Sequence, residues 1–451
     1  MGAFHAYDIR GIYNTDFDKN DVYKIGYFLP KLLKTDRILV GRDARISSPE
    51  IFDYLTKGIT HGGATVYDAG LSTTPMIYYS TARHHFDASV MITASHNGKE
   101  YNGLKVSMTH ALPVGYDNGL KEIEHLMKTK GIVIAEKKGK ILPFDIVDNY
   151  MVFLKRYLPD ISGLNITIDC SNGMAALLIK DILGNQPNYI FDELDGTFPN
   201  HDPNPLVQEN VKDLKKAVKE NKSDIGIIFD GDADRVMFVD EKGEFIPPDL
   251  MIGVLAHHFL KEERTNKPKV IHDIRTSKSV IEYIKKMGGE PYMWKVGRAY
   301  AAIKLREIDG LFGGELAGHY YFRDFYFSDS GILTTLLVLE ILKGLKENGR
   351  NISDLISEIS KYHNSGEINF KIQNKEEAML CLKNYFSESE KLVEFYDFDG
   401  YRLEFADWWF NIRPSNTESY LRLLVEANTK VKLKEKIDTI NKLLNSYISK
   451  K

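Results

Sequence analysis

Three aspartates alternate along one short stretch of this sequence, and their spacing predicts a cation site. Asp230, Asp232 and Asp234 lie in "IGIIFDGDADRVMFVDEKGEFI" (225–246), directly after an apolar run typical of a buried strand. Carboxylates this close repel one another unless a cation neutralises them, and oxygen ligands favour Mg²⁺ or Ca²⁺. An EF-hand is excluded, because Arg235 replaces its required glycine and strands flank the loop. A solvated acidic loop is the alternative.

A serine and a histidine stand side by side in a second polar loop, "VMITASHNGKEYNGLKV" (90–106). The loop contains Ser95 and His96, and Lys105 follows in the next apolar run. A long hairpin loop closed by Asn97-Gly98 would explain the pattern without any chemistry. A hydrolase nucleophile is not supported, because the chain lacks a GxSxG elbow here and an ordered Ser–His–Asp set. Beside a metal and a phosphate site, Ser95 could instead carry a phosphoryl group.

A third loop has the composition of a phosphate cradle. The stretch "IRPSNTESYLRL" (412–423) combines a guanidinium, two hydroxyls and an amide in one turn, with a second arginine shortly after it. Such groups, together with loop N–H donors, can surround a phosphate dianion. An exposed polar turn with a serine helix cap is the alternative. The residues of this predicted cradle are Arg413, Ser415, Asn416, Thr417 and Arg422.

Two further loops carry weaker signals. "LFGGELAGHYYF" (311–322) places Glu315 and His319 between glycines, where backbone can approach a ligand and a carboxylate can accept two sugar hydroxyl hydrogen bonds. "AYDIRGIY" (6–13) offers Arg10 before a glycine, which a turn or helix-capping role would explain equally well.

The elements that must position these loops repeat along the chain. Residues 37–70, 165–196 and 269–298 each read as strand, polar turn, helix, glycine-containing turn and strand. Each is a βαβ signature, so the sequence predicts three related α/β domains with mixed, mostly parallel sheets. The alternating pattern near the C-terminus, followed by an amphipathic helix, predicts a smaller α+β domain. The predicted boundaries are 1–143, 144–246, 247–364 and 365–451.

Composition places the chain among ordinary globular proteins. Its 451 residues are 43% hydrophobic and 27% charged, with a net charge of -4, which gives no footprint for nucleic acid. Two cysteines are too few for a disulfide framework and suit a reducing cytoplasm. We read neither a signal peptide nor an apolar run of membrane-spanning length. The chain is therefore expected to be cytoplasmic and to bind neither nucleic acid nor membrane.

Taken together, the motifs resemble those of the α-D-phosphohexomutases, the phosphomannomutase/phosphoglucomutase family. "YDIRG", "TASHNG", "DGDADR", "WKVGR", "GGELAGH" and "RPSNTE" match in the family's order, from Tyr7 to about Arg422. The resemblance implies the four domains predicted above, placed around a central cleft. It also implies Mg²⁺ as cofactor, hexose phosphates as small-molecule partners and a monomer or weak homodimer. Three positions depart from the family pattern, namely Gly98 for proline, Ala317 for serine and Ser419 for proline.

The resemblance assigns roles to individual residues. Ser95 matches the phosphoserine, and a phosphoserine oxygen completes the metal shell of Asp230, Asp232 and Asp234. Glu315 matches the residue that grips sugar hydroxyls, and the 413–422 loop matches the distal phosphate site. Residues matching those that act on the transferring phosphoryl group or in acid/base work are Arg10, His96, Lys105 and His319. The supporting contacts are Tyr7, Arg235, Lys295 and Arg298.

The expected activity is reversible phosphoryl transfer between C1 and C6 of a hexose phosphate. The phosphoserine gives its group to a free hydroxyl, the resulting hexose 1,6-bisphosphate turns in the cleft, and its other phosphate returns to Ser95. The stretch "GHYYFRDF" is more similar to mannose and glucose mutases than to the glucosamine branch. The alternatives are a phosphoglucosamine mutase and a non-catalytic sugar-phosphate-binding paralogue, and a pure binder needs neither the serine nor the aspartates. The sequence does not decide between mannose and glucose.

Overall fold

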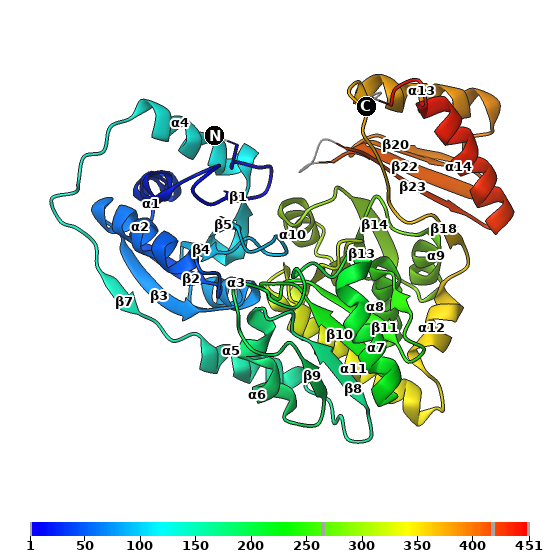
Figure 1. Ribbon diagram of the computed structural model, residues 1–451, viewed down its shortest axis with the longest axis horizontal. Coiled ribbons are helices and arrows are strands. Elements are labelled where there is room, and N and C mark those ends of the chain that lie inside the picture. The colour runs from blue at the N-terminus through cyan, green and yellow to red at the C-terminus, as the bar shows by residue number, and fades with distance from the viewer. Residues whose placement is uncertain (1, 263–266, 416–419, 449–451) are drawn as a thin grey trace.

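The computed structural model describes residues 2–262, 267–415 and 420–448, and these form four units along the chain. Figure 1 shows the first unit in blue and cyan at one end and the last in orange and red at the other. Each unit is built on its own β-sheet, with helices packed against it. Among the helices in the described ranges, none combines the length and apolar character needed to span a membrane.

The first sheet has the order β1-β5-β4-β2-β3-β7, with β6 paired to β5. Its centre is the strand "ASVMI", buried along its whole length because helices or neighbouring units cover both faces. The strands are β1 (Ile9–Ile12), β2 (Arg37–Arg42), β3 (Thr65–Leu71), β4 (Ala88–Ile92), β5 (Tyr101–Met108), β6 (Leu112–Val114) and β7 (Ile141–Pro143). The helices are α1 (Lys19–Leu33), α2 (Ser48–His61), α3 (Thr74–Arg83) and α4 (Lys121–Thr129).

The second sheet has the order β12-β11-β10-β8-β9. The apolar run "IGIIF" before the aspartates is its buried strand β10, as the sequence predicts. The strands are β8 (Ile166–Asp169), β9 (Asn188–Ile190), β10 (Ile225–Phe229), β11 (Val236–Asp240) and β12 (Phe245–Ile246). The helices are α5 (Val147–Leu154), α6 (Ile179–Leu183) and α7 (Lys212–Asn221).

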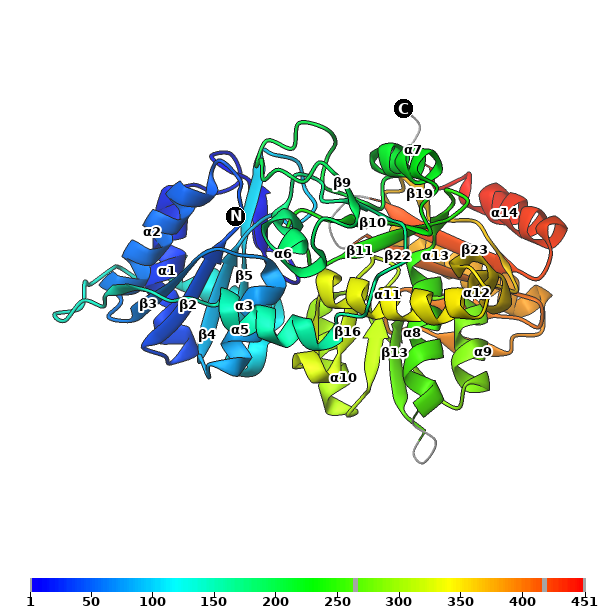
Figure 2. The same ribbon diagram turned by 90° about the horizontal axis from the view of Figure 1, so that it is seen from below.

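The third sheet has the order β14-β13-β15-β16-β17. Its helix α11 is largely buried, contacts both α8 and strand β11 of the second unit, and lies across the middle of the molecule in Figure 2. The strands are β13 (Lys269–Asp273), β14 (Glu290–Trp294), β15 (Phe312–Gly314), β16 (Tyr320–Phe322) and β17 (Ser328–Asp329). The helices are α8 (Pro248–Glu262), α9 (Lys278–Lys286), α10 (Arg298–Glu307), α11 (Gly331–Glu347) and α12 (Ile352–Ile359).

The fourth sheet is antiparallel throughout, with the order β18-β23-β22-β21-β20 and β19 paired to β23. This agrees with the predicted α+β domain. The strands are β18 (His363–Asn364), β19 (Ile368–Phe370), β20 (Glu394–Tyr396), β21 (Tyr401–Glu404), β22 (Trp408–Pro414) and β23 (Leu421–Ala427). The helices are α13 (Lys375–Ser389) and α14 (Lys430–Leu444).

The first three sheets repeat one topology, which confirms the predicted internal repetition. Each predicted βαβ segment forms a parallel pair: β2 with β3, β8 with β9, and β13 with β14. The inner strand of each pair is also parallel to a third strand, which continues into an antiparallel hairpin. These equivalent hairpins are β4–β5, β10–β11 and β15–β16. The sheets are therefore mixed, with the parallel pairings confined to one side.

The packing joins the first three units more closely to one another than to the fourth. Met91, Phe229 and Leu336, from the first, second and third units, belong to one continuous apolar cluster. The fourth unit has its own core, in which Phe386 of α13 packs on Trp408 of β22 with ring centroids 5.0 Å apart. Two hydrogen bonds connect the fourth unit to the third. In both, Nη1 of the buried Arg402 is the donor, and the acceptors are the carbonyl oxygens of residues 274 and 276, each at 2.7 Å.

Candidate active site

The predicted functional loops occupy corresponding places in the fold. The Ser95 loop joins β4 to β5, the aspartate loop joins β10 to β11, and the Glu315 loop joins β15 to β16. These are the three equivalent hairpins of the repeated units, so each unit presents one loop from the same end of its sheet. The predicted phosphate cradle lies on hairpin β22–β23 of the fourth unit.

Ser95 lies directly against the aspartate loop. Its hydroxyl Oγ donates a hydrogen bond to Asp230 Oδ2 at 2.9 Å, and both residues are buried. Ser95 has φ of +53°, in the left-handed region that costs a non-glycine residue roughly 1–2 kcal/mol. Strain of this kind persists where surrounding contacts fix the backbone, and it is common at functional sites. The local sequence supplies one such contact, because Thr93 Oγ1 accepts a hydrogen bond from the Ser95 amide at 2.9 Å.

The three aspartates form a cluster whose donor atoms fit a divalent cation. Asp230, Asp232 and Asp234 are buried, and each offers a carboxylate oxygen within 4.8 Å of the others. Within the described residues, Oδ1 of Asp232 and Oδ1 of Asp234 have no hydrogen-bond partner. Burial, together with the two neighbouring carboxylates, raises the pKa of Asp230 well above its usual value. Buried oxygen donors in excess of their partners are the ligand type that Mg²⁺ prefers.

Lys105 brings a positive charge into the same cluster. Its ammonium lies 2.6 Å from Asp232 Oδ2 and 2.5 Å from Asp234 Oδ2. Burial by itself would lower the pKa of Lys105, but these two carboxylates raise it above its usual value. Thr74 at the start of α3 also donates from its hydroxyl to Asp232 Oδ2 at 2.5 Å. The first unit therefore contributes a serine, a lysine and a threonine to a carboxylate cluster of the second.

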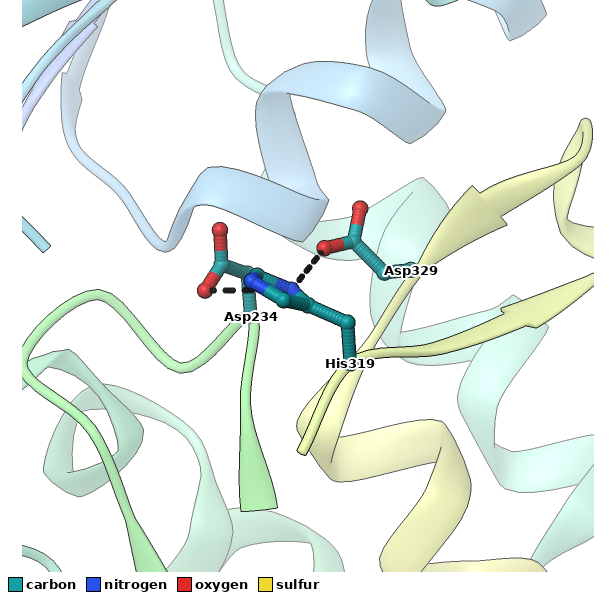
Figure 3. A group of neighbouring side chains, drawn as sticks. All are labelled: Asp234, His319 and Asp329. Atoms are coloured by element: carbon teal, nitrogen blue, oxygen red, sulfur yellow. Dashed lines mark hydrogen bonds and ion pairs between the residues drawn. The ribbon is translucent and has the colours of Figure 1, made fainter. Parts of the chain in front are cut away.

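The third unit reaches the cluster through His319. Figure 3 shows its imidazole between Asp234 and Asp329. Nδ1 of His319 is 2.6 Å from Asp329 Oδ2 and 3.8 Å from Asp234 Oδ1. Arg298 donates from Nε to the other oxygen of Asp329 at 3.1 Å. The backbone of Arg235 forms a β-bridge with that of His319, so the second and third hairpins are joined directly.

Two other predicted residues, one neutral and one positively charged, lie beside the Ser95 loop. His96 Nδ1 lies 3.4 Å from Ser95 Oγ. Burial, followed by the charges of Arg235 and Arg10, lowers the pKa of His96 well below its usual value, so its imidazole is neutral at pH 7. Arg10 pairs with Asp8 and donates from Nη1 to Asn97 Oδ1 at 2.9 Å, which places its guanidinium beside the Ser95 loop.

Glu315 belongs to the same loop as His319, and its carboxylate is held by contacts within the third unit. Its Oε1 accepts a hydrogen bond from the Tyr321 hydroxyl at 2.5 Å, and its Oε2 accepts one from the Gly297 amide at 3.0 Å. Burial raises the pKa of Glu315 above its usual value. Gly297 has φ of +117°, and a Cβ there would lie 2.6 Å from Tyr7 Cζ, so glycine allows the Tyr7 ring to approach.

The predicted phosphate cradle is placed in part. Arg413 is buried and donates from Nε to Asp399 Oδ1 at 3.1 Å, while Asp399 Oδ2 accepts from the Val296 amide at 2.8 Å. The cradle is thereby attached to the 294–298 loop of the third unit. Arg422 lies on the far strand of the hairpin and pairs with Glu367 at 3.0 Å.

The remaining predicted contacts, like the other site roles, stay predictions. The Ser415 amide donates to the carbonyl oxygen of Tyr420 at 2.9 Å, which closes the hairpin, while Asn416 and Thr417 lie outside the described residues. Lys295 lies over the Tyr300 ring, 5.4 Å from its centroid.

Sequence reasoning missed several residues that the fold brings to these loops. Thr74, Asp329 and Asp399 contact predicted site residues, yet each comes from a segment with no recognisable motif. Arg45, in "GRDARISS", contacts the backbone of the Ser95 loop at four points. A signal for Arg45 was available, because the Asp-x-Arg pattern at a strand end occurs again at residues 273–275 of the third repeat.

Comparison with known proteins agrees with this geometry. Four models of phosphoglucomutase/phosphomannomutase domains match the chain in order: alpha/beta/alpha domain I at residues 1–131, domain II at 148–243, domain III at 247–362 and the C-terminal domain at 367–443. A phosphomannomutase of Methanocaldococcus jannaschii is 37% identical, over 98% of this chain and 97% of its own. A phosphomannomutase of Escherichia coli K12 is 36% identical, over 99% of each chain.

A solved structure extends the comparison to three dimensions. A phosphoglucomutase/phosphomannomutase family protein of Burkholderia thailandensis superposes with a TM-score of 0.89 at 28% identity, covering 99% of this chain and 97% of its own. Matching domains, full-length relatives and a shared architecture lead to one conclusion. The chain belongs to the phosphoglucomutase/phosphomannomutase family, whose members are phosphohexomutases, a class of isomerases.

Proposed function

We propose that this protein moves a phosphoryl group between C1 and C6 of mannose phosphate, glucose phosphate or both, with Ser95 as the phosphate carrier. The single observation that supports this most strongly is the hydrogen bond from Ser95 Oγ to Asp230, because it places a hydroxyl nucleophile on a buried carboxylate cluster. A protein that only binds sugar phosphates has no need for that arrangement.

The aspartates would hold the cofactor. Asp230, Asp232 and Asp234 would bind Mg²⁺ together with an oxygen of phosphorylated Ser95. When bound there, the cation would supply charge neutralisation for the phosphoryl group. Lys105 occupies two of the same carboxylates and would turn toward the phosphoryl oxygens when the site is loaded.

The chain's own groups would handle the transferring phosphate and the proton. Arg10 and Arg235 supply positive charge beside Ser95, and charge-assisted hydrogen bonds to phosphoryl oxygens are among the stronger ones in proteins. His319 is oriented by Asp329 in the way that a carboxylate orients a general base, so it would accept the proton of the attacking sugar hydroxyl. His96, neutral and adjacent to Ser95, would contact the transferring phosphoryl group as a hydrogen-bonding partner.

Sugar and distal phosphate would be held by the third and fourth units. Glu315 would accept hydrogen bonds from sugar hydroxyls, with Tyr7, Lys295 and Arg298 as supporting contacts. The cradle residues Arg413, Ser415, Asn416, Thr417 and Arg422 would hold the phosphate that is not reacting. The hexose 1,6-bisphosphate formed in the first half-reaction would turn over and return its other phosphate to Ser95. One transfer site and one cradle then serve both half-reactions. Because a single chain supplies both, the reaction would need no residue from a partner subunit, and we propose a monomer or weak homodimer.

The test begins with Ser95. Intact-mass analysis should find a fraction of purified protein with one added phosphate, mapped by peptide sequencing to residues 93–97. Ser95→Ala should lack this phosphate and nearly all turnover. Ser107→Ala, a change at a buried serine of β5, should retain both. A phosphate mapped to another segment, or an active Ser95→Ala protein, would refute the assignment.

The substrate and cofactor need a separate assay. Turnover measured with mannose 1-phosphate, glucose 1-phosphate and glucosamine 1-phosphate should be highest with one of the first two. A preference for the amino sugar would instead identify a phosphoglucosamine mutase. Activity should disappear in EDTA and return with MgCl₂, and full turnover in the chelator would exclude a catalytic metal. We also propose a cytoplasmic location, which the two free cysteines, Cys170 and Cys381, support.

A further inference from the structure

Arg45 occupies an unusual position beneath the Ser95 loop. It lies in the turn after β2, and its side chain is completely buried. Nη1 donates to the carbonyl oxygens of Gly98 and Tyr101 at 2.6 and 3.1 Å. Nη2 donates to those of Ser95 and Asn97 at 3.0 and 2.7 Å. One guanidinium therefore gathers four carbonyl groups of a seven-residue loop (95–101).

The guanidinium is itself fixed from behind. Asp43 Oδ2 accepts a hydrogen bond from Arg45 Nε at 3.0 Å. Asp43 Oδ1 accepts from the Arg45 amide at 3.1 Å and from the Ser48 hydroxyl at 2.6 Å, so the carboxylate cannot turn without losing three bonds. Phe198 of the second unit covers the guanidinium, with its ring centroid 4.9 Å away. All five guanidinium donors point in directions set by the fold.

The loop needs such a fixed centre. Ser95 is held at φ of +53°, which a serine adopts only when its surroundings impose it. Four carbonyls that converge on one point would repel one another without a cation between them, and a planar array of donors can satisfy all four. In the third repeat the aspartate of the equivalent pair contacts the loop, because Asp273 Oδ2 accepts from the Leu316 amide, while Arg275 pairs with Asp273 and Glu367.

We propose that Arg45 is a positioning residue for phosphoryl transfer, which holds the carbonyl groups of the Ser95 loop so that Oγ stays aligned with the aspartate cluster. The proposal rests on the proposed role of Ser95 as phosphate carrier. Within the part of the chain that the structure describes, the Arg45 side chain hydrogen-bonds to loop backbone and Asp43 and packs on Phe198, so its effect on the reaction passes through the loop.

Arg45→Lys tests this directly. An ammonium is a point charge and cannot reproduce the planar fork, so the loop should lose part of its alignment. A misplacement of about 1 Å near reacting atoms costs roughly 100-fold in rate. We expect kcat to fall about 100-fold with KM changed less than about threefold, because the sugar and distal phosphate contacts lie in the third and fourth units.

The transfer step can be followed separately from overall turnover. Dephosphorylated protein is mixed with labelled glucose 1,6-bisphosphate, and the rate at which label appears on Ser95 is measured for wild type and Arg45→Lys. Arg42→Lys is the matched control, because Arg42 ends strand β2 just before the turn that holds Arg45, but it pairs with Asp68 at 3.1 Å, away from the loop. Guanidinium ion added to Arg45→Ala should restore part of its kcat.

A second variant guards against simple unfolding. If Arg45→Lys does not fold, Asp43→Asn serves instead, because it keeps the shape of Asp43 but weakens its grip on Arg45; its transfer rate should fall with KM preserved. A folded Arg45→Lys protein that transfers label at the wild-type rate overturns the proposal. An Arg45→Lys protein in which only KM is impaired also overturns it, as does a folded and fully active Asp43→Asn protein. Absence of label on Ser95 in the wild type would instead refute the proposed function itself.

Discussion

Gly231 offers a way to move the two halves of the site apart by a known amount. It lies between Asp230 and Asp232, where the aspartate loop crosses the backbone of the Ser95 loop. A Cβ built at Gly231 would lie 2.4 Å from the carbonyl oxygen of Ser95, and ordinary van der Waals contact begins at 3.4 Å. Gly231→Ala must therefore separate the loops by about 1 Å, because the obstructing atom belongs to backbone rather than to a flexible side chain.

The displacement should lower both the reaction rate and the stability. Overpacking by one methyl group typically lowers the free energy of unfolding by about 1–3 kcal/mol. A misplacement of about 1 Å between Ser95 Oγ and the carboxylates should lower kcat roughly 100-fold. KM should change little, because Gly231 is remote from the groups proposed to hold the sugar and the distal phosphate.

The assay compares initial rates and thermal midpoints for wild type, Gly231→Ala and a control in which the added methyl group is crowded only by side chains of the third unit. In Gly289→Ala the new Cβ would lie 2.8 Å from Leu260 Cδ1 and 2.9 Å from Ile284 Cγ2, inside the third unit and before β14. This control should lose stability but keep its kcat. A Gly231→Ala protein with wild-type kcat would refute the reasoning that the spacing of the two loops limits the rate.

Three other predictions concern charges. Lys105→Met leaves buried carboxylates uncompensated, which typically costs roughly 3–5 kcal/mol, so the thermal midpoint of the variant in EDTA should fall. MgCl₂ should raise the midpoint of the variant more than that of wild type. Equal shifts would contradict the idea that Lys105 and Mg²⁺ neutralise the same carboxylates. Arg413→Ala loses a charged contact worth roughly 2–5 kcal/mol and should release free hexose 1,6-bisphosphate, detectable by chromatography; retention equal to wild type would mean that the 412–423 loop is only a turn. Burial raises the pKa of Asp249 from 3.8 to about 7, so the folded state favours the protonated carboxyl group. The free energy of unfolding that this protonated group contributes is therefore lost as pH rises from about 4 to 7. The urea midpoint of Asp249→Asn minus that of wild type should therefore increase between pH 4 and pH 7. A difference between the two midpoints that does not change with pH would exclude the effect.

The sequence predicts the parts of this molecule whose signals are local. The buried run before Asp230, the flanking strands that exclude an EF-hand and the three βαβ segments are all found as predicted, because apolar runs and turn residues determine them over a few positions. The domain boundaries and the roles of individual site residues stay predictions.

Side-chain contacts between segments far apart in the sequence could not be predicted from local sequence patterns. Thr74 reaches Asp232 across 158 positions, and Asp399 reaches Val296 across 103. Nothing in the composition of either segment indicates its partner, since the pairing follows from how whole units dock. His319 combines a predictable and an unpredictable feature. Its motif indicates a functional residue, but its partner Asp329 comes close only through the pairing of β16 with β17.

The equivalent placement of the three hairpins has an evolutionary consequence. A gene segment that is copied whole brings its hairpin to the same end of each new sheet, so three copies arranged around one centre face one another before selection has acted on any loop. Each copy is then free to specialise, and the proposed roles assign one copy to a nucleophile, one to a cation and one to a sugar. With the roles proposed above, divergence in the hairpin of residues 314–319 would change the accepted hexose, while the loops of the other two copies would be inherited unchanged.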